Sequence, residues 1–145
     1  MVTVERTALV GHSAARFFAL VEDVESYPAF LPWCAAAEVR VREAARTVAT
    51  LHVQYRGVRQ RFTTSNALVD GARIEMRLVD GPFRHLHGLW EFTALAEAAC
   101  RVELRLSYEL GSPLLARAIG PAFDHIANTL VDAFVRRADR VYGTA

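Results

Sequence analysis

Two stretches of regular alternation constrain the fold of this chain more than any other feature. Apolar and charged side chains alternate in RIEMRLV, residues 73–79, and a similar alternation occurs in CRVELRLSYEL, residues 100–110. Successive side chains of a β-strand point to opposite faces, so these segments predict antiparallel strands with one buried and one solvated face. The buried face of such a sheet requires a second layer to cover it.

Further strands flank these two segments. Residues 2–10 predict a first strand, and weaker alternation predicts strands over 36–43, 47–56 and 59–69. Asp80-Gly81-Pro82 predicts a hairpin turn, because Asp-Gly supplies a positive φ and proline is tolerated where the next strand begins. We therefore expect a meander of six to seven strands.

Helices are predicted at two places. Ser13 is suited to cap a helix whose apolar face holds Phe17, Leu20, Val21 and Val24, with a short second helix near 25–30. Ser112 and Pro113 open a long amphipathic region, which we expect to break near Pro121 into a helix ending at about 119 and another over 121–142. This region must cover the sheet, which makes the chain an α+β protein.

Composition narrows the class of protein. The 145 residues are 52% hydrophobic with a net charge of +1, and all 17 basic residues are arginine. These values predict a single globular domain over residues 1–145 and argue against a dedicated DNA binder. With two cysteines, no signal peptide and no apolar run of about 20 residues, we expect a cytoplasmic protein.

The histidine pair of DGPFRHLHGLWEF, residues 80–92, raises the question of a metal site. His85 and His87 share one face of the predicted strand, whereas Trp90 and Phe92 lie on the other. The histidines should therefore face outwards. Glu91 could supply a third ligand, but no fourth candidate is fixed by spacing. We predict no metal and no cofactor here.

Motifs of catalysis are missing from the sequence. There is no GxSxG, P-loop, GxGxxG or HExxH pattern, and Cys34 has no histidine at a diagnostic spacing. Asp124 and His125 are neighbours on the helix and point about 100° apart. The sequence therefore predicts a protein that is not an enzyme.

The inner face of the sheet carries aromatic and polar side chains that are suited to either a core or a ligand cavity. Asn66 favours a cavity, because a buried amide needs hydrogen-bond partners that a ligand can provide. The predicted cavity residues are Tyr55, Phe62, Thr64, Asn66, Met76, Leu78, Trp90, Phe92, Leu104, Leu106 and Tyr108 on the strands and Phe123, Ile126 and Leu130 on the helix.

Several motifs together resemble a known family. YPAFLPWC at 27–34, FTTSN at 62–66, LVDGPFRHLHGLWEF at 78–92 and AFVRRADRVYG at 133–143 are similar to the bacterial ribosome-association toxin family. That family is in turn similar to mitochondrial coenzyme Q-binding START proteins and to polyketide cyclases. The resemblance implies a START-like helix-grip fold, in which an antiparallel sheet curves around a long C-terminal helix and two small helices follow strand one.

The resemblance implies three alternative functions. The first is non-enzymatic binding of a hydrophobic ligand, ubiquinone or a related isoprenoid lipid, in support of respiration. The second is a toxin that binds the large ribosomal subunit and blocks subunit joining, with candidate contacts Arg56, Arg59 and Arg61 around the Gly57 turn. The third is a polyketide cyclase-type enzyme, which no acid–base pair of suitable spacing supports.

A ligand in this fold would need an entrance where the helix covers the sheet thinly. We expect that mouth between residues 110–123, 26–33 and the 80–83 turn, with exposed aromatics that touch the inner membrane transiently. The alternative is that these aromatics cap the core. The predicted mouth residues are Tyr27, Phe30, Trp33, Phe83, Leu114 and Leu115.

Overall fold

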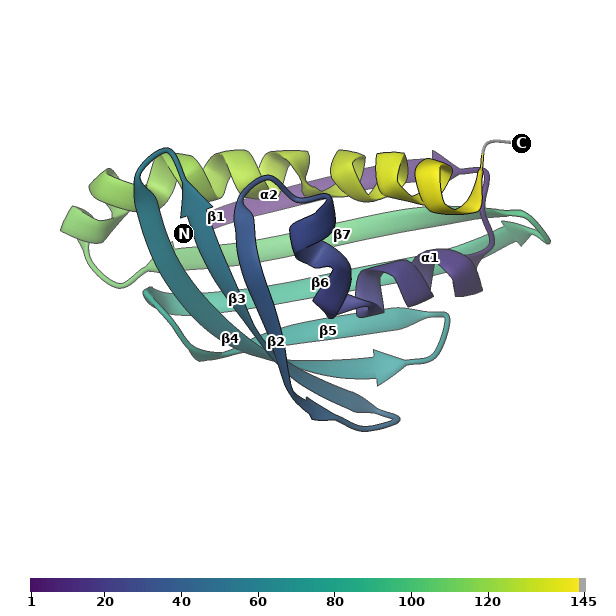
Figure 1. The fold of residues 1–145 in the computed structure, drawn as a ribbon, viewed down its shortest axis with the longest axis horizontal. Helices are drawn as coiled ribbons and strands as arrows, with labels where there is room; N and C mark the ends of the chain where they lie inside the picture. The colour runs from purple at the N-terminus through teal and green to yellow at the C-terminus, as the bar shows by residue number, and fades with distance from the viewer. Residues whose placement is uncertain (144–145) are drawn as a thin grey trace.

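An antiparallel sheet of seven strands curves around one long helix in the computed structural model, which describes residues 1–143 (Figure 1). The strand order is β1-β7-β6-β5-β4-β3-β2, so strands two to seven form a meander and β1 pairs with β7. The predicted α+β helix-grip arrangement is confirmed, with the strand count at its upper limit. The strands are β1 (Val2–Val10), β2 (Cys34–Arg42), β3 (Arg46–Tyr55), β4 (Val58–Val69), β5 (Arg73–Asp80), β6 (Phe83–Ala96) and β7 (Ala99–Leu110).

Both predicted helix starts are confirmed by their capping bonds. The Ser13 hydroxyl oxygen accepts from the Arg16 amide at 3.1 Å and opens α1 (Ala14–Glu22). The Ser112 hydroxyl accepts from the Leu115 amide, also at 3.1 Å, and opens α2 (Pro113–Tyr142). Between α1 and β2 lies the 3-10 helix η1 (Val24–Ala29), which takes the place of the predicted short second helix.

The predicted break near Pro121 is wrong. Helix α2 runs without interruption for 30 residues, with Pro121 inside it. Proline removes one helical hydrogen bond, but Pro121 lies on the exposed side of α2, where water can satisfy the carbonyl left without a partner. The buried residues Ile119, Phe123 and Ile126 keep one continuous apolar face across the proline, and their packing against the sheet favours an unbroken helix.

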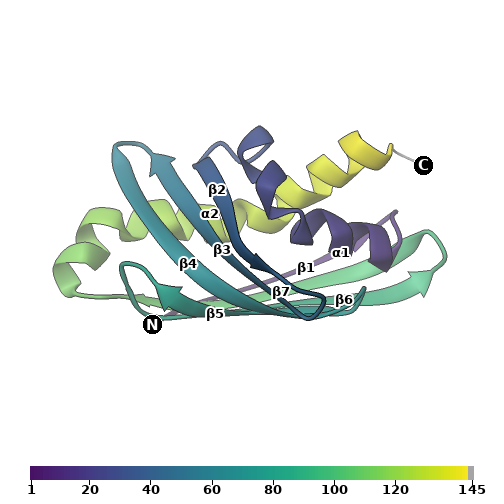
Figure 2. The same cartoon turned by 60° about the horizontal axis from the view of Figure 1, so that its bottom comes forward.

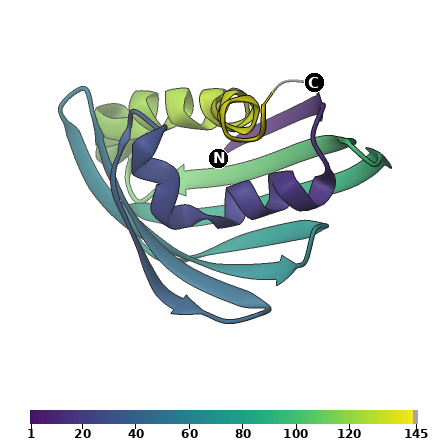
Figure 3. The ribbon, with the colours of Figure 1, turned by 45° about the vertical axis from the view of Figure 1, so that its right-hand side comes forward.

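The sheet is strongly curved. Strands β2, β3 and β4 turn away from the plane of β5–β7 and rise beside α2 (Figure 2). Figure 3, viewed closer to the axis of α2, shows the sheet on one side of this helix and the α1–η1 segment on another. Helix α2 packs on β1 and β7, and η1 packs on β2. No helix of the described residues has the length and apolar character that a membrane span requires.

The pleat of β6 decides the orientation of the histidines as predicted. Leu86, Trp90 and Phe92 are buried on the inner face, whereas His85 and His87 lie half-buried on the outer face. His87 Nε2 lies 2.9 Å from Glu75 Oε2, and this hydrogen bond lowers the pKa of the Glu75 carboxyl. Among residues 1–143 no group of three or more His, Cys, Asp or Glu side chains is placed to hold a metal ion.

Three turns between strands use positive φ angles, at Arg56-Gly57, at Gly71 and at Gly81. Arg56 and Gly57, with φ angles of 49° and 81°, form the two-residue turn between β3 and β4. Gly81 has a φ of 153°, which confirms the predicted hairpin chemistry. A Cβ atom at residue 81 would lie 2.6 Å from Phe62 Cβ, so glycine is required both by the backbone angle and by the close approach of β4.

Replacing Trp90 with alanine should destabilise the fold strongly. Only 2% of Trp90 is exposed, and its ring packs against Phe92 and Phe134. Removal of a large buried aromatic side chain should lower the free energy of unfolding by about 3–5 kcal/mol. Urea denaturation followed by circular dichroism measures this change, and Glu91→Ala, an exposed site on the same strand, is the matched control with an expected effect within about 0.5 kcal/mol.

Candidate ligand-binding cavity

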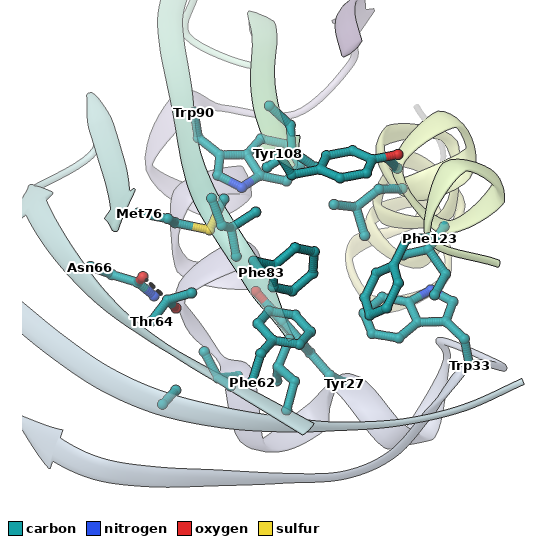
Figure 4. Close-up of a pocket in the computed structure, with 18 of the residues that line it drawn as sticks. Tyr27, Trp33, Phe62, Thr64, Asn66, Met76, Phe83, Trp90, Tyr108 and Phe123 are labelled. Atoms are coloured by element: carbon teal, nitrogen blue, oxygen red, sulfur yellow. Dashed lines mark hydrogen bonds between the residues drawn. The ribbon is translucent and has the colours of Figure 1, made fainter. Parts of the chain in front are cut away.

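A cavity of about 100 Å³ lies between α2 and the inner face of the sheet, with η1 on one side (Figure 4). Its walls are almost entirely apolar, and none of the lining residues carries a charge. The lining consists of Val24, Tyr27, Trp33, Ala49, Leu51, Phe62, Thr64, Asn66, Met76, Phe83, Leu86, Trp90, Leu106, Tyr108, Phe123, Ile126, Ala127, Leu130 and Phe134. The cavity is therefore suited to an uncharged, hydrophobic guest.

One aromatic cluster closes the cavity beside the first half of α2. Phe83 is its centre, with ring centroids 5.0 Å from Phe123, 5.7 Å from Phe62 and 6.2 Å from Tyr108. All three contacts are edge-to-face, which is a favourable geometry for aromatic rings. We call these four residues the Phe83 cluster.

A second aromatic cluster closes the cavity toward η1 and the second half of α2. Phe134 is its centre, with ring centroids 5.3 Å from Tyr27, 5.2 Å from Phe30 and 5.4 Å from Trp90. Phe92 lies behind Trp90, stacked on it at 6.1 Å. We call Tyr27, Phe30, Trp90 and Phe134 the Phe134 cluster, and the cavity lies between it and the Phe83 cluster.

The hydroxyl groups in the lining donate hydrogen bonds to protein atoms. Thr64 Oγ1 donates to Asn66 Oδ1 at 2.9 Å (Figure 4). The Tyr27 hydroxyl donates to the carbonyl of Val21, and the Tyr108 hydroxyl donates to the carboxylate of Asp124. Burial raises the pKa of both tyrosines well above the ordinary range, and the Asp124 carboxylate adds to the shift at Tyr108. Both phenols are therefore protonated and act as fixed structural donors.

The β5–β6 hairpin opens beside the Phe83 cluster. Paired residues run from Arg73 opposite Glu91 to Arg77 opposite His87, and beyond them the two strands separate. The end of β5 continues to pair with β4, and the start of β6 pairs with β7. The sheet therefore has an unpaired seam at this point, and the buried Phe83 side chain lies at the same end of the hairpin.

A surface groove adjoins the cavity at Tyr108. It runs between the start of β1, the end of β7 and the first turns of α2, and it includes Arg84, Glu109 and Asp124. Tyr108 lines both the groove and the cavity, so the hydrogen bond from Tyr108 to Asp124 lies where the two hollows meet. Leu114, near the groove, is 75% exposed.

Most residues predicted to form a cavity do line it. The lining includes Phe62, Thr64, Asn66, Met76, Trp90, Leu106, Tyr108, Phe123, Ile126 and Leu130. Four predicted cavity residues lie elsewhere. Tyr55 stacks on His125 at the open end of β3, Leu78 is half-buried near the end of β5, Phe92 packs on Phe17 and Phe18, and Leu104 is a core residue.

The predicted mouth needs correction. Trp33 and Phe83 are only 6% and 8% exposed, and Tyr27 and Phe30 are half-buried, so these aromatics do not form an exposed rim. Tyr27, Trp33 and Phe83 line the cavity instead, whereas Phe30, Leu114 and Leu115 do not. The reason is that η1 folds down onto β2 and α2, which removes its aromatic side chains from water.

The sequence pattern missed several lining residues. Val24, Ala49, Leu51, Leu86, Ala127 and Phe134 were not predicted to line a cavity. Phe134 follows Leu130 and Ile126 at steps of four, and Leu86 shares the buried face of β6 with Trp90, so period alone could have found these two. The others depend on how deeply each strand lies under the helix, which period does not give.

The three candidate ribosome contacts lie together at the β3–β4 turn. Arg56, Arg59 and Arg61 are exposed, and the ion pairs found among residues 1–143 include none of them. The Arg56 guanidinium lies over the Tyr55 ring, 5.1 Å from its centroid. The turn therefore presents three positive charges to solvent.

Comparisons with known proteins agree with this geometry. The model of a family described as polyketide cyclase / dehydrase and lipid transport matches residues 10–135. The ribosome association toxin RatA of Pseudomonas aeruginosa is 47% identical over 140 residues, 97% of each chain. The mitochondrial coenzyme Q-binding protein COQ10 homolog B of Xenopus laevis is 27% identical over 93% of this chain and 57% of its own length. The Zhui aromatase/cyclase from Streptomyces sp. R1128 has a TM-score of 0.82 at 21% identity, covers 99% of both chains and shows the fold alone.

The Cys34 thiol should be unreactive in the folded protein. Burial raises the pKa of Cys34 from 9.0 to about 11, and the thiol donates to the Ala36 carbonyl at 3.5 Å. We expect no labelling by iodoacetamide at pH 8 in buffer and complete labelling in urea, measured by intact mass. The stability that this thiol contributes is present below pH 9 and lost as the pH rises through about 11, because the unfolded thiol ionises first. Fast labelling of Cys34 in buffer would contradict this account.

Proposed function

This chain belongs to the polyketide cyclase / dehydrase and lipid transport family, and from that membership we propose that it holds a hydrophobic ligand between its sheet and α2 without converting it. The observation that carries the proposal is the cavity itself. It is enclosed by two aromatic clusters, and its lining contains no charged side chain. A largely apolar cavity without charged side chains stabilises an uncharged guest and offers no counter-ion to a charged one.

The ligand class that we propose is an isoprenoid quinone or a related lipid. A volume of about 100 Å³ is of the order that accommodates one small ring. The isoprenoid tail then requires the Phe83 cluster to open, beside the seam between β5 and β6. Similarity to a protein named coenzyme Q-binding supports the same class.

Binding rather than catalysis is supported by the protonation states in the cavity. General acid–base catalysis needs a group that exchanges protons near the working pH. The two phenols in the lining have raised pKa values and donate to protein acceptors, and Asn66 and Thr64 do not titrate. A polyketide cyclase-type reaction is therefore the less supported use of this cavity.

Ligand entry through the surface groove would bring the protein to a membrane. Leu114 is exposed, and Met1 at the groove is 73% exposed, which gives this end of the molecule an apolar tip. Arg84 lines the groove, where it pairs with Glu109 at 3.5 Å, and Arg117 is exposed near the start of α2, and both suit an anionic lipid surface. We propose that a transient contact with the inner membrane loads the cavity through this end.

The protein purified from a quinone-producing host should carry lipid. Extraction with organic solvent followed by mass spectrometry should recover a quinone or isoprenoid at a substantial fraction of one molecule per chain, because an apolar cavity retains an apolar guest. Delipidated protein should then take up added quinone with quenching of the fluorescence of the two tryptophans, Trp33 and Trp90, which both line the cavity.

The control for this experiment is Ala127→Trp, which fills the cavity from α2. This variant should keep the helical circular dichroism spectrum and lose lipid. A wild-type protein that is empty on purification and fails to take up added quinone would refute the proposed function.

The second candidate function is association with the large ribosomal subunit. It is favoured by 47% identity to a protein named ribosome association toxin and by the three unpaired arginines at the β3–β4 turn. Arginine binds phosphate through a planar, bidentate fork, so a tight cluster of arginines on a hairpin suits ribosomal RNA even when the net charge is near zero. In this reading the protein blocks subunit joining.

Reversal of two charges at the turn should abolish ribosome association. The double variant Arg59→Glu and Arg61→Glu should be absent from the large-subunit fractions of a sucrose gradient, because its glutamates are repelled by the RNA phosphates that the arginines attract. Arg73→Glu is the matched control, since Arg73 is exposed at the opposite end of β4, beside Val69. Wild-type protein that never sediments with large subunits, together with an unchanged ratio of free subunits to 70S particles, would remove this candidate.

A further inference from the structure

We infer that the cavity selects a neutral ligand that carries a hydrogen-bond acceptor, and that the Asn66 amide and the Trp90 indole N–H bind that acceptor. This inference rests on the proposed function and names the polar part of the ligand. It follows from which donors and acceptors in the cavity the protein already uses.

The oxygen atoms in the lining are engaged with protein groups. The three hydroxyls, on Tyr27, Thr64 and Tyr108, each donate their hydrogen to a protein acceptor. The bond from Thr64 also fixes the Asn66 amide, because a hydroxyl hydrogen can be donated to Oδ1 and not to the NH₂ group. The bond to Thr64 therefore does not use the Asn66 Nδ2 atom.

The groups that remain are N–H donors. No hydrogen bond found among residues 1–143 uses Asn66 Nδ2 or Trp90 Nε1, and the same holds for the indole nitrogen of Trp33. Asn66 is 8% exposed and Trp90 2% exposed, and neither nitrogen is among the fully buried side-chain atoms without a partner, so the small accessible surface of each fits a position facing the cavity. An unpaired donor in such a place costs stability, and a ligand acceptor that pairs with it recovers that free energy.

Asn66 and Trp90 lie at the same end of the cavity. Both, together with Met76, Val24 and Tyr27, also line a small side pocket that continues from the cavity. Met76 lies between them, and the Trp90 nitrogen points toward the side where Met76 and Asn66 lie (Figure 4). Met76 pairs across the strands with Gly88, and a Cβ atom there would lie 2.3 Å from Met76 Cε, so the glycine gives the flexible thioether its place.

The charges around this end exclude other head groups. The side pocket is lined by Glu22, whose Oε1 accepts from Thr47 at 2.6 Å and whose Oε2 pairs with Arg42 at 2.7 Å. A carboxylate head group would meet this negative charge without a cation in the cavity lining, and an ammonium would find the Glu22 oxygens already engaged. A ketone, quinone or ester carbonyl accepts two hydrogen bonds and carries no charge, which fits the donors present.

The test compares two small probes of similar shape, a butyl-substituted benzoquinone and butylbenzene, by isothermal titration calorimetry. Asn66→Leu removes both amide hydrogens at similar side-chain volume. It should weaken quinone binding by roughly three- to ten-fold, the value of one neutral hydrogen bond, and leave butylbenzene affinity unchanged or stronger. Asn66→Asp should weaken quinone binding as well, because it replaces the amide donors with an oxygen.

Thr50→Val is the matched control. It removes a buried hydroxyl that lies 2.6 Å from the Thr63 hydroxyl and is not part of the cavity lining, so it should leave the ratio of the two affinities unchanged. A second measurement needs no variant: the infrared carbonyl stretch of the bound quinone should shift to lower frequency relative to the quinone in hexane.

The outcomes separate the two proposals. The inference is overturned if Asn66→Leu leaves the ratio of the two affinities unchanged, or if the carbonyl stretch of the bound quinone equals that in hexane. In either case, quinone binding by the wild-type protein still supports the proposed function. Wild-type protein that binds neither probe removes both. A shift of the ratio in Asn66→Leu, with a lowered carbonyl frequency in the wild type, supports the inference.

Discussion

The whole structure depends on covering the apolar face of one sheet with one helix. Seven strands spaced about 4.8 Å apart make a sheet roughly 30 Å wide, whereas a helix with its side chains is only about 10 Å across. A flat sheet would leave most of its apolar face exposed to water. The sheet therefore curves until β2–β4 stand beside α2, and α1 and η1 cover what the helix does not reach. Because α2 packs on β1 and β7, the space that its side chains do not fill lies between the helix and the strands farther along the sheet.

Aromatic side chains fill that remaining space from its two ends. The Phe83 and Phe134 clusters span the distance between α2 and the far strands, which shorter aliphatic side chains would leave open. Each hydroxyl hydrogen in the lining is donated to a protein acceptor, and the groups that the hydrogen bonds found among residues 1–143 leave unused are N–H donors. Asn66 is only 8% exposed, and none of the hydrogen bonds found among residues 1–143 uses its Nδ2 atom, so an acceptor on a guest molecule would add a hydrogen bond at this position. The same curvature that closes the fold thus creates a cavity with a defined chemistry.

The periodicity of apolar residues and the helix-capping residues predict most of the fold from the sequence alone. Alternation gave the strands, and it placed Trp90 inside and His87 outside because the pleat leaves no other choice. Period gives the face of a strand but not its depth under a helix, which is why Tyr55 and Phe92 were expected in the cavity and lie beyond its ends. Pro121 predicts a break that does not occur, because the long apolar face of α2 stabilises the helix by more than one lost hydrogen bond costs. The aromatics of η1 were expected at an exposed rim because no local signal reports that a short 3-10 helix folds back onto α2.

The two candidate functions use different surfaces of the same fold, one facing the cavity and one facing solvent. The cavity lining faces inwards and contains no arginine, whereas Arg56, Arg59 and Arg61 project into solvent from the β3–β4 turn. The outer side chains of a strand can change without changing its inner ones, so a surface for phosphate and a pocket for lipid can each be kept or lost separately. Tyr55 is where the two regions come closest, because its ring lies under the Arg56 guanidinium and stacks on His125 of α2 at 5.3 Å. This stack fixes the turn against the helix, so the same helix that encloses the cavity also holds the arginines in place.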